Sequence, residues 1–238
     1  SYAYVEGEVF IQEIVKTNGV EGIAKAFSHP PTSRNLVTNP EWYLDPSKRP
    51  DSSFKVKAGL DHFDAYFADQ DFLLQRMDFD ESMLRTAASS LPSEDIERYA
   101  DAVLQSRVTL GAKMNFFGQA LAVAALHQCQ DKNHAELLVQ LSRDLIKAKE
   151  SVSKDTASPI IKSEWEEIDE KDIIGFRVNQ VVNSNGIKTP TQSQLVRRGS
   201  FVCEITLVQI QMPKEELLGL AKEILTIALS QSETIEEK

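Results

Sequence analysis

The chain has 238 residues, enough for one large domain or for one domain with a smaller helical unit. Apolar residues make up 42% and charged residues 26%, which excludes a chain that is disordered throughout. The net charge of −10 argues against a nucleic-acid binder, because phosphate contacts need a basic patch and only Arg197 and Arg198 are adjacent arginines.

No stretch predicts a membrane-spanning helix. The most apolar run, Phe116 to Leu126, has about half of the roughly 20 residues that a span requires. No signal peptide is visible, and the chain opens on Ser1 directly before a helical pattern. We therefore expect a processed chain or a piece of a longer one, so the compartment does not follow from a missing targeting signal.

The first 44 residues predict a helical segment. Tyr4, Ile11 and Val15 form an apolar stripe at helical spacing, which Phe10 and Ile14 widen. The pair at 18–19, Asn-Gly, predicts the end of this helix, and a second helix is expected over 20–28. It ends before the prolines at 30–31, where Thr32 and Ser33 could cap a further turn.

A polar stretch with two prolines, residues 45–53, predicts a linker to a domain over 54–238. The first half of this domain is ambiguous. Phe63, Tyr66 and Phe67 fit a short helix or a strand, while Asp80 and Ser93 suit the starts of two helices. Strand content before residue 116 is left open.

The second half of the domain has a clearer pattern. Residues 119–130 predict a buried strand, with a helix as the alternative because of their alanines, and Asp131 then caps a helix to about Glu150. Strands are expected at 160–165, 174–182, 191–196 and 201–210, with a hairpin turn at Asn185-Gly186. Pro213 opens a closing helix whose inward residues are Leu217, Ala221, Ile224 and Ala228.

This order of elements predicts an α+β fold, with a helical segment followed by an antiparallel sheet that carries helices packed on one face. The two cysteines, Cys129 and Cys203, are either free buried thiols or one disulfide, since spacing alone does not bring their Cβ atoms together.

The four histidines, His29, His62, His127 and His134, form no HExxH or CxxC-type motif. A metal site from His127, Cys129 and His134 lacks a fourth ligand, so we interpret them as strand and helix-start residues.

An acidic run could bind Ca²⁺, but it lacks the spacing and central glycine of an EF-hand, and we interpret it as a solvated loop between strands. Its members are Glu164, Glu166, Glu167, Asp169, Glu170 and Asp172.

Nucleophile and phosphate-binding motifs are missing from the sequence. The serine of Gly199-Ser200 sits in no GxSxG elbow, and no Gly-rich phosphate loop occurs. Arg197-Arg198 could hold an anion at a strand edge, although such pairs more often mark a solvated hairpin end. Trp42 and Trp165 are expected to be packed anchors.

Two segments resemble known families. The first, over 4–44, is similar to a segment of secreted or lipoprotein-type HExxH zinc-peptidase-like proteins of bacteria and archaea. The matching residues are Tyr4, Glu6, Gly7, Phe10, Asn18-Gly19, Ala24, Ala26-Phe27, Pro30 to Ser33, Pro40-Glu41 and Tyr43-Leu44. The match departs over 35–39, where Asn39 stands in the position of a family histidine, and the HExxH helix itself is absent. No catalytic role is therefore carried over, even to Glu6.

The second resemblance covers 117–150 and 172–230, which look like extracytoplasmic sensor-like or PsbP-like α/β sandwich domains. It rests on Ile174-Gly175-Phe176, on the Arg198-Gly199 turn and on the closing helix from Pro213. It implies an accessory or ligand-sensing unit.

From these observations we predict a non-catalytic accessory or binding portion of an extracytoplasmic metallopeptidase-like protein, with a small molecule or a protein as partner. We assign no catalytic residue, cofactor or metal ligand. One alternative is a stand-alone binding module with an apolar cavity between sheet and helices. The other is a hydrolase whose carboxylates are brought together by the fold, namely Asp61, Asp64, Asp69 and Glu81.

Overall fold

The computed structural model describes residues 2–31, 36–37, 39–48, 57–79, 81–115, 118–153, 160–184 and 187–236. Contacts within the chain divide it into two units, 1–53 and 54–238, which are treated separately below. The predicted division into a helical segment, a linker over 45–53 and a domain from 54 stays a prediction. No helix among the described residues is long and apolar enough to cross a membrane.

The first unit is helical, with α1 (Tyr2–Ser28), α3 (Pro40–Leu44) and the 3-10 turn η1 (Pro46–Lys48). A kink interrupts α1 at Gly19, whose φ of 62° lies in the left-handed region that glycine tolerates. The predicted helix break is therefore confirmed. The cap expected from Thr32 and Ser33 falls on residues outside those described.

The buried face of α1 differs from the predicted stripe. Phe10 and Ile14 are buried, and the Phe10 ring meets Tyr43 edge-on at 5.3 Å between centroids. Ile11 and Val15 are 36% and 40% exposed. The apolar residues of this helix cover a wide face, so the helix is able to turn either Ile11 and Val15 or Phe10 and Ile14 toward a core. Tyr43 of α3 packs with Phe10 and Ile14, and these are the two residues that are buried.

The second unit is built on a seven-stranded sheet in the order β1-β2-β3-β7-β6-β5-β4, in which every neighbouring pair is antiparallel. Its strands are β1 (Leu73–Phe79), β2 (Val103–Asn115), β3 (Gly118–Cys129), β4 (Ile160–Glu170), β5 (Ile173–Ser184), β6 (Ile187–Arg198) and β7 (Phe201–Val208). The hairpin between β5 and β6 is confirmed by the pairing of Ser184 with Ile187, while the turn residues at 185–186 lie outside the described part.

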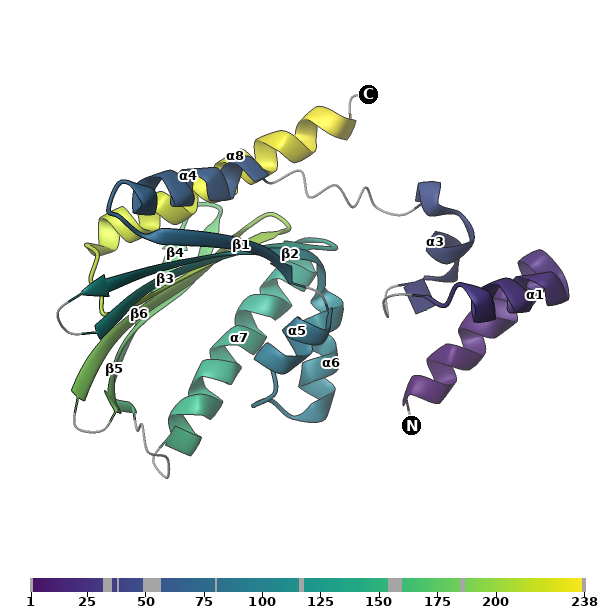
Figure 1. Cartoon of the computed structure of the whole chain (residues 1–238), viewed down its shortest axis with the longest axis horizontal. Helices are drawn as coiled ribbons and strands as arrows, with labels where there is room; N and C mark the ends of the chain where they lie inside the picture. The colour runs from purple at the N-terminus through teal and green to yellow at the C-terminus, as the bar shows by residue number, and fades with distance from the viewer. Residues whose placement is uncertain are drawn as a thin grey trace. The chain divides into compact units, whose positions relative to one another are not determined.

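In the described part of this unit, five helices pack on the sheet (Figure 1). α4 (Lys57–Ala68) and α8 (Lys214–Glu236) lie side by side on one face. α5 (Glu81–Ala87), α6 (Ser93–Ala102) and α7 (Lys132–Ser153) lie on the other. The α+β class and the antiparallel sheet are confirmed, whereas the expectation that helices cover only one face is corrected. Strand β7 shows why, because its apolar residues alternate between both faces.

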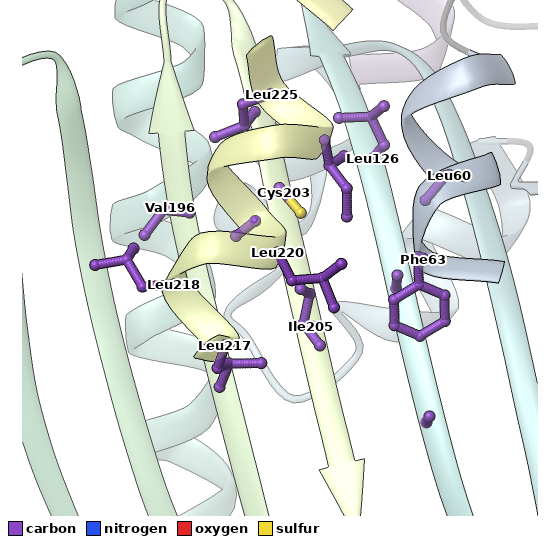
Figure 2. Close-up of a cluster of buried hydrophobic side chains, with 14 of the residues drawn as sticks. Leu60, Phe63, Leu126, Val196, Cys203, Ile205, Leu217, Leu218, Leu220 and Leu225 are labelled. Carbon is purple, nitrogen blue, oxygen red and sulfur yellow. The ribbon is translucent and has the colours of Figure 1, made fainter. Parts of the chain in front are cut away.

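The core on the α8 face joins β3 and β7 to both helices (Figure 2). Leu126, Cys203 and Ile205 of the sheet meet the leucines of α8 and Phe63 of α4, and all three are fully buried. The four inward residues predicted for the closing helix are buried as expected. Burying a leucine-sized side chain contributes about 2 kcal/mol, so this face supplies much of the stability.

The other face has its own core beneath α7. Leu138, Leu141 and Leu145, which share one side of that helix, pack with Phe176 and Val178 of β5. Cys129 belongs to this core and Cys203 to the opposite one, so the sheet separates the two thiols. Both cysteines are free and buried, which rejects the disulfide alternative.

Strands β1 and β2 are the elements that the sequence left open, and Phe63, Tyr66 and Phe67 lie on the helix α4. The predicted strand at 119–130 is confirmed as β3. The predicted loop through the acidic run is wrong, because β4 continues to Glu170 and pairs with β5 along that length.

Candidate polar groove beside the start of helix α8

Polar side chains form a strip across β4, β5 and β6 on the face that carries α8. The strand register places Glu166, Arg177 and Gln194 in one row across the three strands. The next row holds Glu164, Asn179 and Gln192. Across β3 and β7 the same rows continue with apolar residues. The polar strip therefore occupies one end of an otherwise apolar sheet face.

Arg177 is the centre of this strip and is only 2% exposed. Its Nε and Nη2 donate to the side-chain oxygen of Gln194, and Nη2 also donates to the backbone oxygen of Lys214 at 2.8 Å. Nη1 donates to Glu166 at 3.0 Å. A hydrogen bond from Lys214 lowers the pKa of the Glu166 carboxyl, and the charge of Arg177 lowers it further. The buried cation is therefore well satisfied, as a buried charge must be.

Two glutamines of β6 attach the sheet to the backbone just before α8 and in the first turn of that helix. The Gln192 amide donates to the backbone oxygen of Met212 and accepts from its N–H, both at 3.2 Å. Gln194 donates to the backbone oxygen of Leu217 at 3.2 Å. These bonds fix the backbone where it crosses the sheet end, so the surface next to it is held in place.

A groove of about 320 Å³ lies beside this attachment, which we call the amide groove. Four of its lining residues carry side-chain amides, of which Gln180 donates to Glu150 of α7 on the other face of the sheet and Gln192 bonds the Met212 backbone. Its Lys162 and Glu164 pair with each other at 2.6 Å. Its full lining is Lys162, Glu164, Asn179, Gln180, Val181, Pro190, Thr191, Gln192, Gln211 and Met212. Asn179 and Gln211 are exposed. An amide offers both donors and an acceptor, so this lining suits uncharged polar groups.

A second groove, of about 290 Å³, lies between β4 and the start of α8. It contains Arg177 and Lys214, but five acidic residues share its wall with them. The two cations already hold Glu166, which leaves this groove without the excess positive charge that an anion site needs. Both grooves have polar surface over about half of their lining and neither lies between the sheet and a helix core, unlike the apolar cavity expected for the stand-alone module.

The acidic run is a strand whose carboxylates have basic partners on the flanking elements. Lys162, Lys214, Arg143, Lys222 and Arg198 pair with the acidic side chains Glu164, Glu166, Glu167, Glu170 and Asp172, respectively. The run is exposed, as predicted, but it does not gather around an ion. Among the described residues, no group of three or more His, Cys, Asp or Glu side chains could hold a metal.

The structure separates the candidate metal ligands. His127 is 3% exposed beneath α7, and neither ring nitrogen has a hydrogen-bond partner. Burial lowers the pKa of this imidazole to about 4. His134 stands at the start of α7, where its backbone N–H donates to Asp131 at 2.9 Å. This bond confirms Asp131 as the helix cap.

The remaining histidines have local roles in the described chain. His62 of α4 pairs with Glu223 of α8, and His29 lies 3.0 Å from the hydroxyl of Ser28. Neither belongs to the amide groove.

The carboxylates of the hydrolase alternative do not form an acid–base pair. Arg76 holds both Asp61 and Asp64, with 2.6 Å from its Nε to Asp64. Asp69 is exposed, and the side chain of Glu81 lies outside the described part, as does that of Glu6. One arginine therefore binds the two aspartates of α4, and the four carboxylates of this alternative form no common cluster among the described side chains.

The arginine pair and the tryptophans also have packing roles. Arg197 is 4% exposed and pairs with Glu136 of α7, while Arg198 pairs with Asp172. The anion site at this strand edge is therefore not supported. Trp165 packs on Phe176 at 5.4 Å between ring centroids, and Trp42 packs against the core of the first unit, which confirms both as anchors.

The sequence analysis missed the amides of the groove. Thr191 to Gln194 is a run of four polar residues inside a predicted strand, and two of them are buried. Consecutive polar residues on both faces of a strand are a usable signal, because one face of a buried strand is normally apolar.

No family model and no curated protein matches the chain. Among solved structures, the extracellular domain of PknH from Mycobacterium tuberculosis is similar, with a TM-score of 0.43 and 10% identity over 67% of this chain and 85% of that one. The Rv0999 ortholog from Mycobacterium smegmatis has a TM-score of 0.32 and 9% identity, over 77% of this chain and 98% of that one. The first of these two structures is an extracellular domain. The metallopeptidase resemblance gains no support.

Proposed function

We propose that this chain is a non-catalytic binding domain that takes an uncharged polar ligand in the amide groove. The observation that carries the proposal is the lining of this groove, where the exposed amides of Asn179 and Gln211 lie beside an internally paired lysine and glutamate. Its volume of about 320 Å³ lies at the small end of the usual range for ligand sites.

The groove is also rigid on one side, which favours binding. The reciprocal bonds between Gln192 and the Met212 backbone hold its floor before a ligand arrives. A preformed site loses less side-chain and loop entropy when it is filled, so more of the contact energy appears as affinity. The exposed amides of Asn179 and Gln211 are then the groups that meet the ligand.

The test is a titration followed by side-chain amide NMR on the full chain. A neutral disaccharide and an N-acetylated dipeptide amide are the probes, with phosphate and arginine as charged comparators. We expect one neutral probe to shift the NH₂ signals of Asn179 and Gln211, and Asn179→Leu to abolish the effect. The matched control Gln119→Leu changes an exposed amide outside the groove and should bind normally. Shifts produced only by the charged probes would contradict the proposal.

We place this domain outside the cytoplasm, on the sensor-like resemblance of residues 117–150 and 172–230. The two cysteines give no evidence for this placement, because they lie on opposite faces of the sheet and form no disulfide. The metallopeptidase-like parent stays a prediction that rests on residues 4–44 alone, since no family model matches the chain. Protease digestion of intact cells should remove the native protein, whereas its recovery with cytosolic enzymes would refute the placement.

A further inference from the structure

We infer that the ligand of the amide groove is a peptide segment with a small aliphatic side chain, an inference that rests on the proposed function. The groove offers two kinds of surface in neighbouring rows of the sheet. The strand register pairs Asn179 of β5 with Gln192 of β6 in one row. In the next row on the same face it pairs Val181 with Pro190. The groove therefore presents amides next to an aliphatic patch.

Two amides of the groove are available to a ligand. Asn179 and Gln211 are exposed, and among the described residues neither has a hydrogen-bond partner within the chain. The other two amides of the lining are engaged within the chain. A side-chain amide offers donors and an acceptor together, which complements a peptide group with its own N–H and C=O. The two exposed amides therefore match a peptide backbone.

The apolar part of the groove is aliphatic. Val181 and Pro190 are partly buried, and Met212 is buried. Within the described chain, none of the residues that line the groove is aromatic. A sugar ring presents a flat C–H face that aromatic side chains cover in many binding sites, whereas a valine-sized side chain packs well on aliphatic groups. The lining therefore favours a peptide over a saccharide.

The spacing of the two rows fits an extended peptide. Rows on one face of a strand lie two residues apart, which is about 6.6 Å along the strand. An extended ligand chain has the same repeat. A peptide group held at Asn179 therefore brings the side chain of a nearby ligand residue over Val181 and Pro190.

The charges of the groove disfavour the free ends of a peptide. Lys162 and Glu164 pair with each other at 2.6 Å, so each charge is already matched before a terminal carboxylate or ammonium group arrives. A charged ligand group would lose hydration here without gaining a free partner. The ligand is therefore an internal or blocked segment of a chain.

The test is isothermal titration calorimetry of the full chain with N-acetyl-valyl-alanine amide at up to about 10 mM. Two analogues isolate the two contacts. An ester in place of the central peptide bond removes one N–H, and glycine in place of valine removes the aliphatic group. We expect each analogue to bind about tenfold more weakly than the parent peptide, since each loses one contact.

The matched variants are Asn179→Asp and Gln119→Glu, each of which replaces an exposed amide by a carboxylate of similar size. The first removes the donors that meet the ligand and should weaken binding of the parent peptide by about tenfold. The second lies outside the groove and should leave the affinity unchanged. Equal affinities for the unchanged chain and for Asn179→Asp would reject the inference, because the peptide would then bind elsewhere.

Maltose, a neutral disaccharide, separates the inference from the proposed function. If maltose shifts the side-chain amide NMR signals of Asn179 and Gln211 while the peptide does not bind, the peptide inference is overturned and the binding of an uncharged ligand stands. If neither uncharged probe binds, both are overturned. Binding of the peptide together with the loss in Asn179→Asp supports both.

Discussion

The two edges of the sheet, β4 and β1, both have one open side, but their side chains are partnered in different ways. Five acidic residues at the β4 edge, four on the strand and Asp172 in the turn after it, pair with basic residues from the same strand, β5, β6, α7 and α8. Two of these five, Glu166 and Glu170, are tied to α8, the helix whose start borders the amide groove. On strand β1, Arg76 pairs with two aspartates of α4 and Asp78 pairs with Arg107 of β2, and the apolar side chain of Leu73 is exposed beside them. The comparison indicates that charges tie β4 to both helix layers, whereas those of β1 tie it to one helix and its neighbouring strand.

The largest expected effect comes from breaking the network that anchors β4. Gln194→Leu removes the acceptor of two Arg177 donors and leaves a buried cation with fewer partners. We expect a loss of about 3 kcal/mol in the free energy of unfolding, because an incompletely paired buried charge is costly. Urea unfolding measures it. The control Gln75→Leu alters an exposed amide on β1 and should cost less than about 0.5 kcal/mol. Equal losses in the two variants would remove the distinction between the edges.

A second prediction concerns the buried His127 of β3, a strand in the interior of the sheet. Burial lowers the pKa of His127 from 6.5 to about 4, so the folded state favours the neutral imidazole. Its contribution to stability is complete above pH 6.5 and is lost as the pH falls toward 4, since the unfolded chain takes up the proton first. At about 1.4 kcal/mol per pKa unit the total is about 3 kcal/mol.

The variant His127→Leu isolates this contribution. Unfolding free energies measured between pH 4 and 7 should fall less steeply for the variant than for the unchanged chain. Parallel curves for His127→Leu and the unchanged chain would show that the buried imidazole does not control the acid response.

The smallest effect is expected at a single ion pair of the β4 edge. Lys222→Ala breaks the contact with Glu170. The side chain of Lys222 is 38% exposed and that of Glu170 is 53% exposed. Exposed pairs contribute roughly 0.2–1 kcal/mol and are screened by salt. We therefore expect a loss of about 0.5 kcal/mol in dilute buffer that shrinks in 1 M NaCl. Lys188→Ala, an exposed lysine at the hairpin end, is the reference. A loss that salt leaves unchanged would mean that packing, not charge, holds the pair.

How far the sequence predicted this molecule depended on the strength of the local pattern. The strands after residue 118 and the closing helix were predicted because their apolar residues repeat at a clear period. Strands β1 and β2 were missed, since Leu73 is apolar and exposed while Thr109 is polar and fully buried. The acidic run looked like a loop because its partners, such as Arg143 and Lys222, lie 24 and 52 residues away along the chain.

The sequence by itself determined the α+β class, the helix break at Gly19, the hairpin after Ser184 and the inward face of α8. These features follow from backbone preferences and from periodicity, which are local. Only the tertiary structure decided that helices cover both faces, that the two cysteines lie on opposite sides of the sheet, and that Asn179 and Gln211 line one groove. The physical reason is strand register, which brings together residues far apart in the chain and is set by the packing of the whole sheet.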